Sequence, residues 1–155
     1  MSKLYFKYGV MGSSKSAIAL MTKYNYEQKG FNIMLIKPAI DTRDGDMVSS
    51  RIGISCKCFK FGKDFDLVKY FNEQNSLKKV NGVIVDEVQF CTREQIEALR
   101  EIANTVSVIC FGLKTNFKSE LFEGSKRLLE IADNISEIKT VCKCGNKAII
   151  NAKVV

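Results

Sequence analysis

The hydrophobic residues divide most of the chain into segments of alternating strand and helix character. Apolar runs of strand length occur at residues 3–9, 31–38, 54–61, 81–90 and 105–113. Between them, hydrophobic residues recur at helical spacing in 14–30, in 65–77, after Thr92 and in 122–133. Strand and helix patterns that alternate in this way favour an α/β domain with a mostly parallel sheet.

The spacing within these segments also predicts which side chains are buried. Thr92 and Gln95 form the capping box T-x-x-Q, which marks the start of a helix. The side chains expected on buried faces are Leu4 and Phe6 in strand 3–9, Ile18, Met21 and Tyr24 in helix 14–30, and Ile96, Leu99 and Ile102 after Thr92. Cys56 and Cys58 alternate with polar residues, so residues 54–61 are predicted to form one strand.

Two segments depart from the regular alternation. Residues 41–53, DTRDGDMVSSRIG, are polar and rich in turn residues, and we predict a mobile loop there. Near the end of the chain, two β-like runs flank a tight turn that contains Cys142 and Cys144, which is half of a zinc knuckle. The expected organisation is an α/β unit over residues 1–137 and a small, partial zinc-binding β-hairpin over 138–155.

Composition and charge narrow the class of protein. A chain of 155 residues, of which 46% are hydrophobic, can bury one substantial core. It has no apolar stretch near the roughly 20 residues of a membrane span, and no signal-peptide pattern. We therefore expect a cytoplasmic protein without membrane contact, with reduced thiols and with Cys91 and Cys110 in the core. The net charge of +7 suits an anionic partner, but the lysines are scattered, so nucleic acid is not expected.

A phosphate-binding loop is predicted between the first strand and the first helix. Gly9, four further residues, Ser14, Lys15 and Ser16 match the P-loop pattern G-x-x-x-x-G-K-[ST] everywhere except at the second glycine. Backbone N–H groups and the positive end of a helix favour a bound phosphate at this place. Gly12 would supply part of the backbone freedom that Ser14 removes. For the loop by itself, an ordinary strand–turn–helix junction is the alternative.

Two adjacent acids follow a later apolar strand. Asp86 has the Walker-B position, in which a carboxylate opposite the P-loop holds Mg²⁺, and Glu87 beside it is placed to accept a proton. Adjacent acids after a strand also occur as a solvated turn. Both motifs within one α/β domain favour binding of a nucleoside triphosphate. The alternatives are a DExx-type ATPase, suggested by the residues DEVQ, and a non-catalytic module that binds nucleotides or nucleic acid.

Several ordered motifs, spread over essentially the whole chain, resemble the cellular-type (class II) thymidine kinases. They are GVMGSSKSA, KPAIDTRDGDMVSSRIG, VDEVQF, GLKTNFKSELFEGS and TVCKCGNKAIINAK. The resemblance implies a Rossmann-like P-loop domain that transfers the γ-phosphoryl group of ATP to the 5′-hydroxyl of thymidine, with deoxyuridine as a second acceptor. It also implies Mg²⁺, structural Zn²⁺, a homotetramer, and inhibition by thymidine triphosphate.

The resemblance also implies roles for single residues. Glu87 would be the general base, and Arg43 would act as a cation near the transferred phosphoryl group. Mg²⁺ would be held by Ser16 and Asp86, and Zn²⁺ by Cys142 and Cys144. The residues implied for ATP binding are Gly9, Gly12, Ser13, Ser14, Lys15, Ser16 and Asp86. Those implied for thymidine are Met11, Phe90, Leu113, Phe117, Phe122 and Asn151.

The chain departs from the family pattern at three places. Ser14 replaces a glycine of the phosphate loop, and Cys142 and Cys144 are spaced C-x-C where much of the family has C-x-x-C. Family members also continue beyond the position of Val155 into a second pair of metal ligands and a lid over the base. Two cysteines do not fill a four-ligand zinc site, and Cys56 and Cys58 are expected to be buried strand residues instead. We therefore expect the chain by itself to have low activity or none.

Overall fold

A computed structural model describes residues 2–9, 15–39, 47–49, 55–141 and 147–148. Its centre is a six-stranded sheet in the order β5-β2-β6-β7-β1-β8. In chain order these strands are β1 (Leu4–Tyr8), β2 (Ile33–Pro38), β5 (Phe59–Phe61), β6 (Gly82–Val85), β7 (Ser107–Gly112) and β8 (Asn134–Glu137). Neighbouring strands in this sheet are parallel. The predicted α/β fold with a mostly parallel sheet is therefore confirmed.

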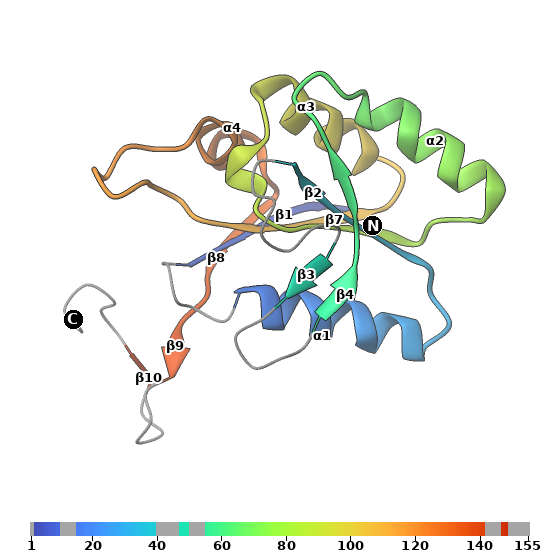
Figure 1. Ribbon diagram of the computed structural model, residues 1–155, viewed down its shortest axis with the longest axis horizontal. Helices are drawn as coiled ribbons and strands as arrows, with labels where there is room; N and C mark the ends of the chain where they lie inside the picture. Colours follow the sequence, from blue (N-terminus) through green and yellow to red (C-terminus); the bar gives the residue numbers. More distant parts are fainter. Residues whose placement is uncertain (1, 10–14, 40–46, 50–54, 142–146, 149–155) are drawn as a thin grey trace.

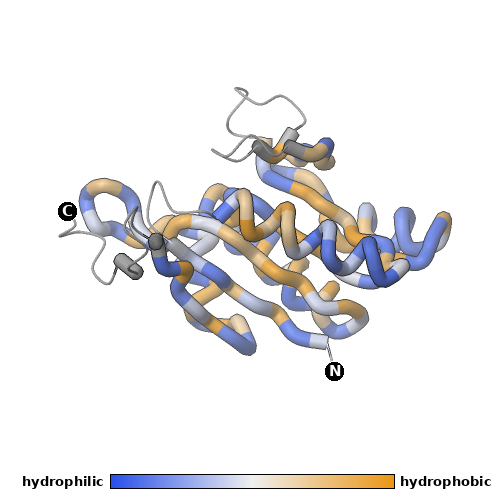
Figure 2. The backbone as a smooth tube through the Cα atoms, turned by 90° about the horizontal axis from the view of Figure 1, so that it is seen from below, coloured by the Kyte–Doolittle hydropathy of each residue, from blue (hydrophilic) through white to orange (hydrophobic). Residues whose placement is uncertain are grey.

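Helices cover both faces of the sheet (Figure 1). One face carries α1 (Lys15–Gln28), and the other carries α2 (Leu67–Leu77), α3 (Arg93–Ile102) and α4 (Glu123–Ile131). Each face buries its own hydrophobic cluster. Figure 2 shows the hydrophobic residues concentrated along the central strands. These strands read as nearly continuous apolar runs because a parallel sheet covered on both faces has no solvent-facing side.

Side-chain caps begin two of the helices. The Thr92 hydroxyl accepts the Gln95 amide and the Gln95 side chain accepts the Thr92 amide, both at 3.1 Å, so the predicted capping box is confirmed. At the start of α2, Asp66 accepts the Lys69 amide at 3.0 Å. Such caps satisfy amides that have no partner within the helix. The side chains of α3 predicted to be buried, Ile96, Leu99 and Ile102, are buried.

The segment before α2 differs from the prediction. The single strand expected over 54–61 is two strands, because β4 (Ser55–Lys57) pairs antiparallel with β3 (Met47–Ser49), whereas β5 pairs with β2 in the main sheet. The first of these partners, β3, falls within the predicted loop 41–53, so the prediction of a loop was wrong for residues 47–49. A strand is defined by its hydrogen-bonding partner, which a local pattern does not identify.

The strand before the two acids ends as predicted, whereas a further strand was missed. Strand β6 stops at Val85, directly before Asp86 and Glu87, and a short 3-10 turn, η1 (Val88–Phe90), follows the two acids. The edge strand β8 was not predicted, because its residues NISE are mostly polar and partly exposed. An edge strand has one partner only and needs little apolar surface, so its sequence carries a weak signal.

The predicted buried face of the first helix was partly wrong. Met21 and Tyr24 are exposed, whereas the buried residues of α1 are Ala17, Ala19 and Leu20. Apolar residues lie on several sides of this helix, so the spacing of the large ones did not identify the face against the sheet. Small alanine side chains there allow the helix to approach the strands closely.

Two short strands near the end of the described chain, β9 (Thr140–Val141) and β10 (Lys147–Ala148), pair antiparallel. Figure 1 shows this pair beyond the end of β8. The pairing agrees with the two predicted β-like runs. Cys142 and Cys144 lie outside the described residues, so the zinc site and the domain boundary after residue 137 stay predictions.

No disulfide joins the described cysteines, Cys56, Cys58, Cys91 and Cys110. Cys91 and Cys110 are buried as predicted, and burial raises the pKa of both thiols, so both stay protonated near neutral pH. Cys56 and Cys58 are half-buried beside the cluster on the α1 face. Within the described residues, no helix has both the length and the apolar character needed to cross a membrane.

Candidate functional site

The predicted phosphate loop connects the end of β1 to the start of α1. The Gly9 amide donates to the Gly112 carbonyl at the end of β7, at 3.2 Å, and Lys15 and Ser16 form the first turn of α1. The loop therefore begins at the carboxyl ends of the parallel strands, which we call the carboxyl edge of the sheet. It ends at a helix N-terminus, where α/β proteins bind phosphates. Outside the described residues lie Met11, Gly12, Ser13 and Ser14.

Ser16 and Asp86 join this loop to the neighbouring strands. Ser16 Oγ donates to Asp86 Oδ2 at 3.1 Å. Asp86 follows β6 directly and is 4% exposed, and its amide donates to the Ile36 carbonyl of β2 at 3.0 Å. A hydroxyl and a carboxylate are the oxygen ligands that Mg²⁺ prefers. The two residues implied as Mg²⁺ ligands thus lie together and have suitable chemistry.

The positive charges of two lysines favour the ionised form of the Asp86 carboxyl group. Burial raises the pKa of Asp86, while the Glu87 amide, the Ser16 hydroxyl and the charges of Lys37 and Lys15 oppose that rise. Lys37, near the end of β2, is only 3% exposed. Sequence reasoning missed it, although a lysine within the apolar run FNIMLIKP was a usable signal. The two cations give this edge of the sheet the positive charge that suits an anionic phosphate group.

Glu87 has a backbone conformation that residues other than glycine rarely adopt. Its φ is 52° and its ψ is 39°, in the left-handed region. A residue held there costs about 1–3 kcal/mol, and such residues are concentrated at functional sites. The sharp turn places a half-buried acid directly after the buried Asp86. One carboxylate can therefore face a metal while the next one reaches a substrate.

On the side expected to hold the nucleoside, Phe90 and Phe122 lie together. Their rings meet edge to face, with centroids 5.5 Å apart. Phe90 belongs to η1, three residues after Glu87, and it also lines a cavity of about 200 Å³ beside Pro38 and Phe61. Leu113 is half-buried at the end of β7. Three residues implied for thymidine binding therefore lie in the segments that follow the carboxyl ends of β6 and β7.

The segment between β7 and α4 forms a small hairpin, residues 114–122. Thr115 pairs with Leu121 in an antiparallel bridge, and the Asn116 side chain accepts the amides of Lys118 and Glu120 at 2.8 and 3.1 Å. Phe117 stands near the tip and is 92% exposed, with Lys118 Nζ 5.7 Å from its ring centroid. Its role in thymidine binding stays a prediction, as do those of the residues outside the described ranges, Met11, Arg43 and Asn151.

The start of α4 packs directly against η1 at Gly124. A Cβ atom at this position would lie 2.5 Å from the Val88 carbonyl oxygen and 2.9 Å from that of Cys91. We expect Gly124→Ala to lower the free energy of unfolding by about 1–3 kcal/mol, because backbone must move apart to admit the methyl group. Urea denaturation measures this change.

A matched control for that variant is Gly62→Ala. Apart from its two chain neighbours, none of the described residues has an atom within 4 Å of the position that a Cβ at Gly62 would take. This substitution should leave stability unchanged or raise it slightly. Equal urea midpoints for Gly124→Ala and the wild-type chain would contradict the close packing of α4 on η1.

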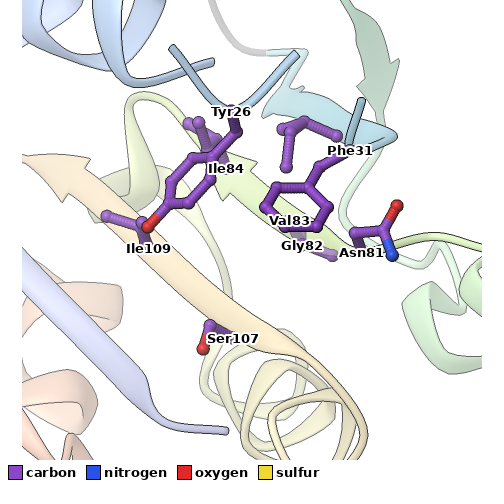
Figure 3. Close-up of a pocket in the computed structure, with 9 residues that line it drawn as sticks. Tyr26, Phe31, Asn81, Gly82, Val83, Ile84, Ser107 and Ile109 are labelled. Atoms are coloured by element: carbon purple, nitrogen blue, oxygen red, sulfur yellow. The ribbon is translucent and has the colours of Figure 1, made fainter. Parts of the chain in front are cut away.

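A second cavity, of about 180 Å³, lies at the opposite edge of the sheet (Figure 3). Tyr26 and Phe31 lie above the starts of β6 and β7, where Gly82 and Ser107 line the cavity. Asp86 follows the other end of β6. Since parallel sheets bind substrates at the carboxyl ends of their strands, this cavity is separate from the candidate site.

A structural metal centre is not found in the part of the chain that the structure describes. No three cysteine, aspartate or glutamate side chains gather there in a group that could hold a metal ion, and the sequence has no histidine. The predicted zinc ligands lie outside these residues. The oxygen pair of Ser16 and Asp86 fits an Mg²⁺ ion that also binds phosphate oxygens and water, because such sites use only one or two protein ligands.

Comparison with known proteins agrees with this geometry. A family model described as thymidine kinase matches residues 2–155. The thymidine kinase of Enterobacteria phage T4 is 43% identical over 157 aligned residues, which cover 99% of this chain and 81% of the phage protein. The thymidine kinase of Haemophilus influenzae is 44% identical over 151 residues, or 96% of this chain and 78% of that protein. The chain therefore belongs to the thymidine kinase family.

Proposed function

We propose that the chain transfers the γ-phosphoryl group of ATP to the 5′-hydroxyl of thymidine, giving ADP and thymidine monophosphate. The family membership supports this activity. The observation that carries the proposal for the site is the 3.1 Å hydrogen bond between Ser16 and Asp86, with Glu87 next in the chain. This hydrogen bond joins the first turn of α1 to the acidic residues that follow β6.

Phosphoryl transfer depends mainly on positioning and on neutralising charge. Lys15 and the amides at the start of α1 would hold the β- and γ-phosphates of ATP. Bound Mg²⁺ would neutralise part of their charge, held by Ser16 and Asp86. Glu87 would accept the proton of the 5′-hydroxyl. At the same time, the hydroxyl oxygen would bond to the γ-phosphorus, and the bond between the γ-phosphorus and the ADP oxygen would break. Arg43 would stabilise the transferred group, as the resemblance implies.

The buried lysine Lys37 extends this set of charges. It is placed to offset the Asp86 carboxylate from the side of β2, while Lys15 does so from the side of α1. Both cations also offset part of the net negative charge that the complex of ATP and Mg²⁺ would bring to the site.

The test is ADP formation by the full chain with ATP and Mg²⁺, in the presence of thymidine, deoxyuridine, deoxycytidine, deoxyadenosine or no acceptor. The expected result is turnover confined to thymidine and deoxyuridine, even where its rate is low. ATP hydrolysis without a nucleoside, stimulated by single-stranded DNA, would instead favour a DExx-type ATPase. Absence of turnover with every acceptor would contradict the proposed activity.

We also propose that the chain forms a homotetramer, that thymidine triphosphate inhibits it, and that it works in the cytoplasm. The family resemblance supports the first two points. The exposed Met21 and Tyr24 on α1 offer apolar surface that an assembly could cover. The lack of a disulfide among the described cysteines suits a reducing compartment. Light scattering at several concentrations tests the assembly, and thymidine triphosphate titration tests the inhibition.

A further inference from the structure

The backbone of Leu113 is held from both sides by buried polar side chains. Its amide donates to Gln89 Oε1 at 3.1 Å, and its carbonyl accepts the Ser125 hydroxyl. Gln89 is 4% exposed and Ser125 is fully buried. Buried polar groups that lose a partner are costly, so these two bonds fix the position of the Leu113 backbone firmly.

Two glycines allow these bonds to form. A Cβ atom at Gly112 would overlap Gln89 Oε1 and would lie 3.0 Å from a methyl group of Val88. On the other side, Gly124 lets the start of α4 approach η1, which brings the next residue, Ser125, to Leu113. The contact therefore depends on close packing of three elements, β7, η1 and α4.

The segment held in this way is the hairpin that follows Leu113. The Phe122 amide donates to the Lys114 carbonyl at 3.4 Å, so the two ends of the hairpin are tied together. Glu123, next in the chain, accepts the Arg93 amide at 2.8 Å and links the same end to α3. A displacement of Leu113 would thus be transmitted to Phe122, which faces Phe90.

Gln89 belongs to η1, the 3-10 turn that directly follows its N-cap residue Glu87. One short segment therefore carries the acid implied as the general base, the side chain that holds Leu113, and the aromatic ring of Phe90. The distance between the acid and the hairpin is set by this turn and by the two hydrogen bonds to Leu113, not by the hairpin itself.

We propose that Gln89 is a positioning residue for the nucleoside. With Ser125, it fixes Leu113 and the hairpin 114–122 relative to Glu87, so that the acceptor hydroxyl is presented to the phosphoryl-transfer site. The inference rests on the proposed function, since it treats Leu113 and Phe122 as parts of the nucleoside pocket. Its consequence is that loss of Gln89 weakens use of thymidine more than use of ATP.

The first experiment measures hydrogen exchange of the Leu113 amide by NMR, in the full chain without nucleoside. In Gln89→Leu, the amide loses its acceptor, and we expect its exchange to become about tenfold faster. The matched control is Gln95→Leu, because Gln95 is equally buried but its side chain bonds to the Thr92 amide and to the Gly62 and Lys63 carbonyls instead of to Leu113. Exchange of Leu113 should be unchanged in that control.

The second experiment is steady-state kinetics of the same variants. Gln89→Leu should raise KM for thymidine by about tenfold, the size expected for one unsatisfied buried amide, and leave KM for ATP unchanged. Ser125→Ala should shift KM for thymidine in the same direction. Because Ser125→Ala removes a single hydroxyl group, this variant can be used for the KM measurements if Gln89→Leu does not fold. Gln95→Leu should change the two KM values equally or not at all.

Unchanged exchange of Leu113 in Gln89→Leu would overturn the inference. So would an equal rise of KM for ATP and thymidine, or a control variant that shows the same selective loss. If the wild-type chain phosphorylates no nucleoside, the proposed function fails, and the exchange measurement still decides whether Gln89 holds Leu113.

Discussion

Replacing Glu87 with glutamine is expected to lower kcat for thymidine by about 10²–10⁴-fold, the contribution typical of a general acid or base. Glutamine has nearly the same shape as glutamate but does not accept the proton of the 5′-hydroxyl. The strained backbone at this position, with φ at 52°, is retained, so the variant isolates the carboxylate. Initial rates of ADP formation at saturating ATP and thymidine measure the change.

The binding of ATP provides the control for Glu87→Gln. If Glu87 acts on the proton alone, the dissociation constant of Mg-ATP, measured by titration calorimetry, should be close to that of the wild-type chain. A variant with normal kcat would rule out Glu87 as the base. A variant that also loses ATP binding would point to a structural or metal-binding role for this side chain.

Asp86→Asn is expected to lower activity and raise stability at the same time. Loss of the carboxylate should reduce kcat/KM by about a hundredfold or more, since charge neutralisation by a metal is worth several kcal/mol. The stability of the nucleotide-free protein should rise, because burial raises the pKa of Asp86 and the ionised form is therefore unfavourable in the folded state. Kinetics and thermal unfolding at neutral pH measure the two effects.

The pH dependence of unfolding follows from the direction of this pKa shift. A carboxyl group whose pKa is raised by folding stabilises the folded state below its unfolded pKa, and this stabilisation is lost as pH rises through the folded pKa. The advantage of Asp86→Asn should therefore be present at pH 7 and disappear near pH 3.8, the ordinary value of the group. A variant less stable than wild type at pH 7 would show that Lys15 and Lys37 outweigh the cost of burial.

Local features of the sequence predicted the elements that carry the site. The strand-to-loop-to-helix order around Lys15 and the acids after an apolar run are read from neighbouring residues, and the capping box spans only four residues. These signals depend on periodicity and motif spacing, so they can be recognised in the sequence without knowledge of the fold. The aromatic residues Phe90 and Phe122 were identified only through the resemblance. An aromatic side chain by itself indicates a core position at least as strongly as a binding site.

Contacts between segments that are distant in the sequence could not be predicted from periodicity and motif spacing. The division of residues 54–61 into β4 and β5 follows from two different pairing partners, β3 and β2, that local pattern does not name. The buried face of α1 depended on how closely its alanines approach the sheet. Lys37 is unusual within the apolar run FNIMLIKP, but only the sheet brings it close to Asp86.

The sequence by itself determined the alternating α/β organisation, the phosphate loop and the adjacent acids, because each is encoded within a short stretch of chain. Only the tertiary structure decided that Ser16 meets Asp86 and that Gln89 and Ser125 hold Leu113 between them. These bonds join residues that lie far apart in the sequence. They form only when parallel strands place their carboxyl ends along one edge and small glycines allow η1, β7 and α4 to pack in contact.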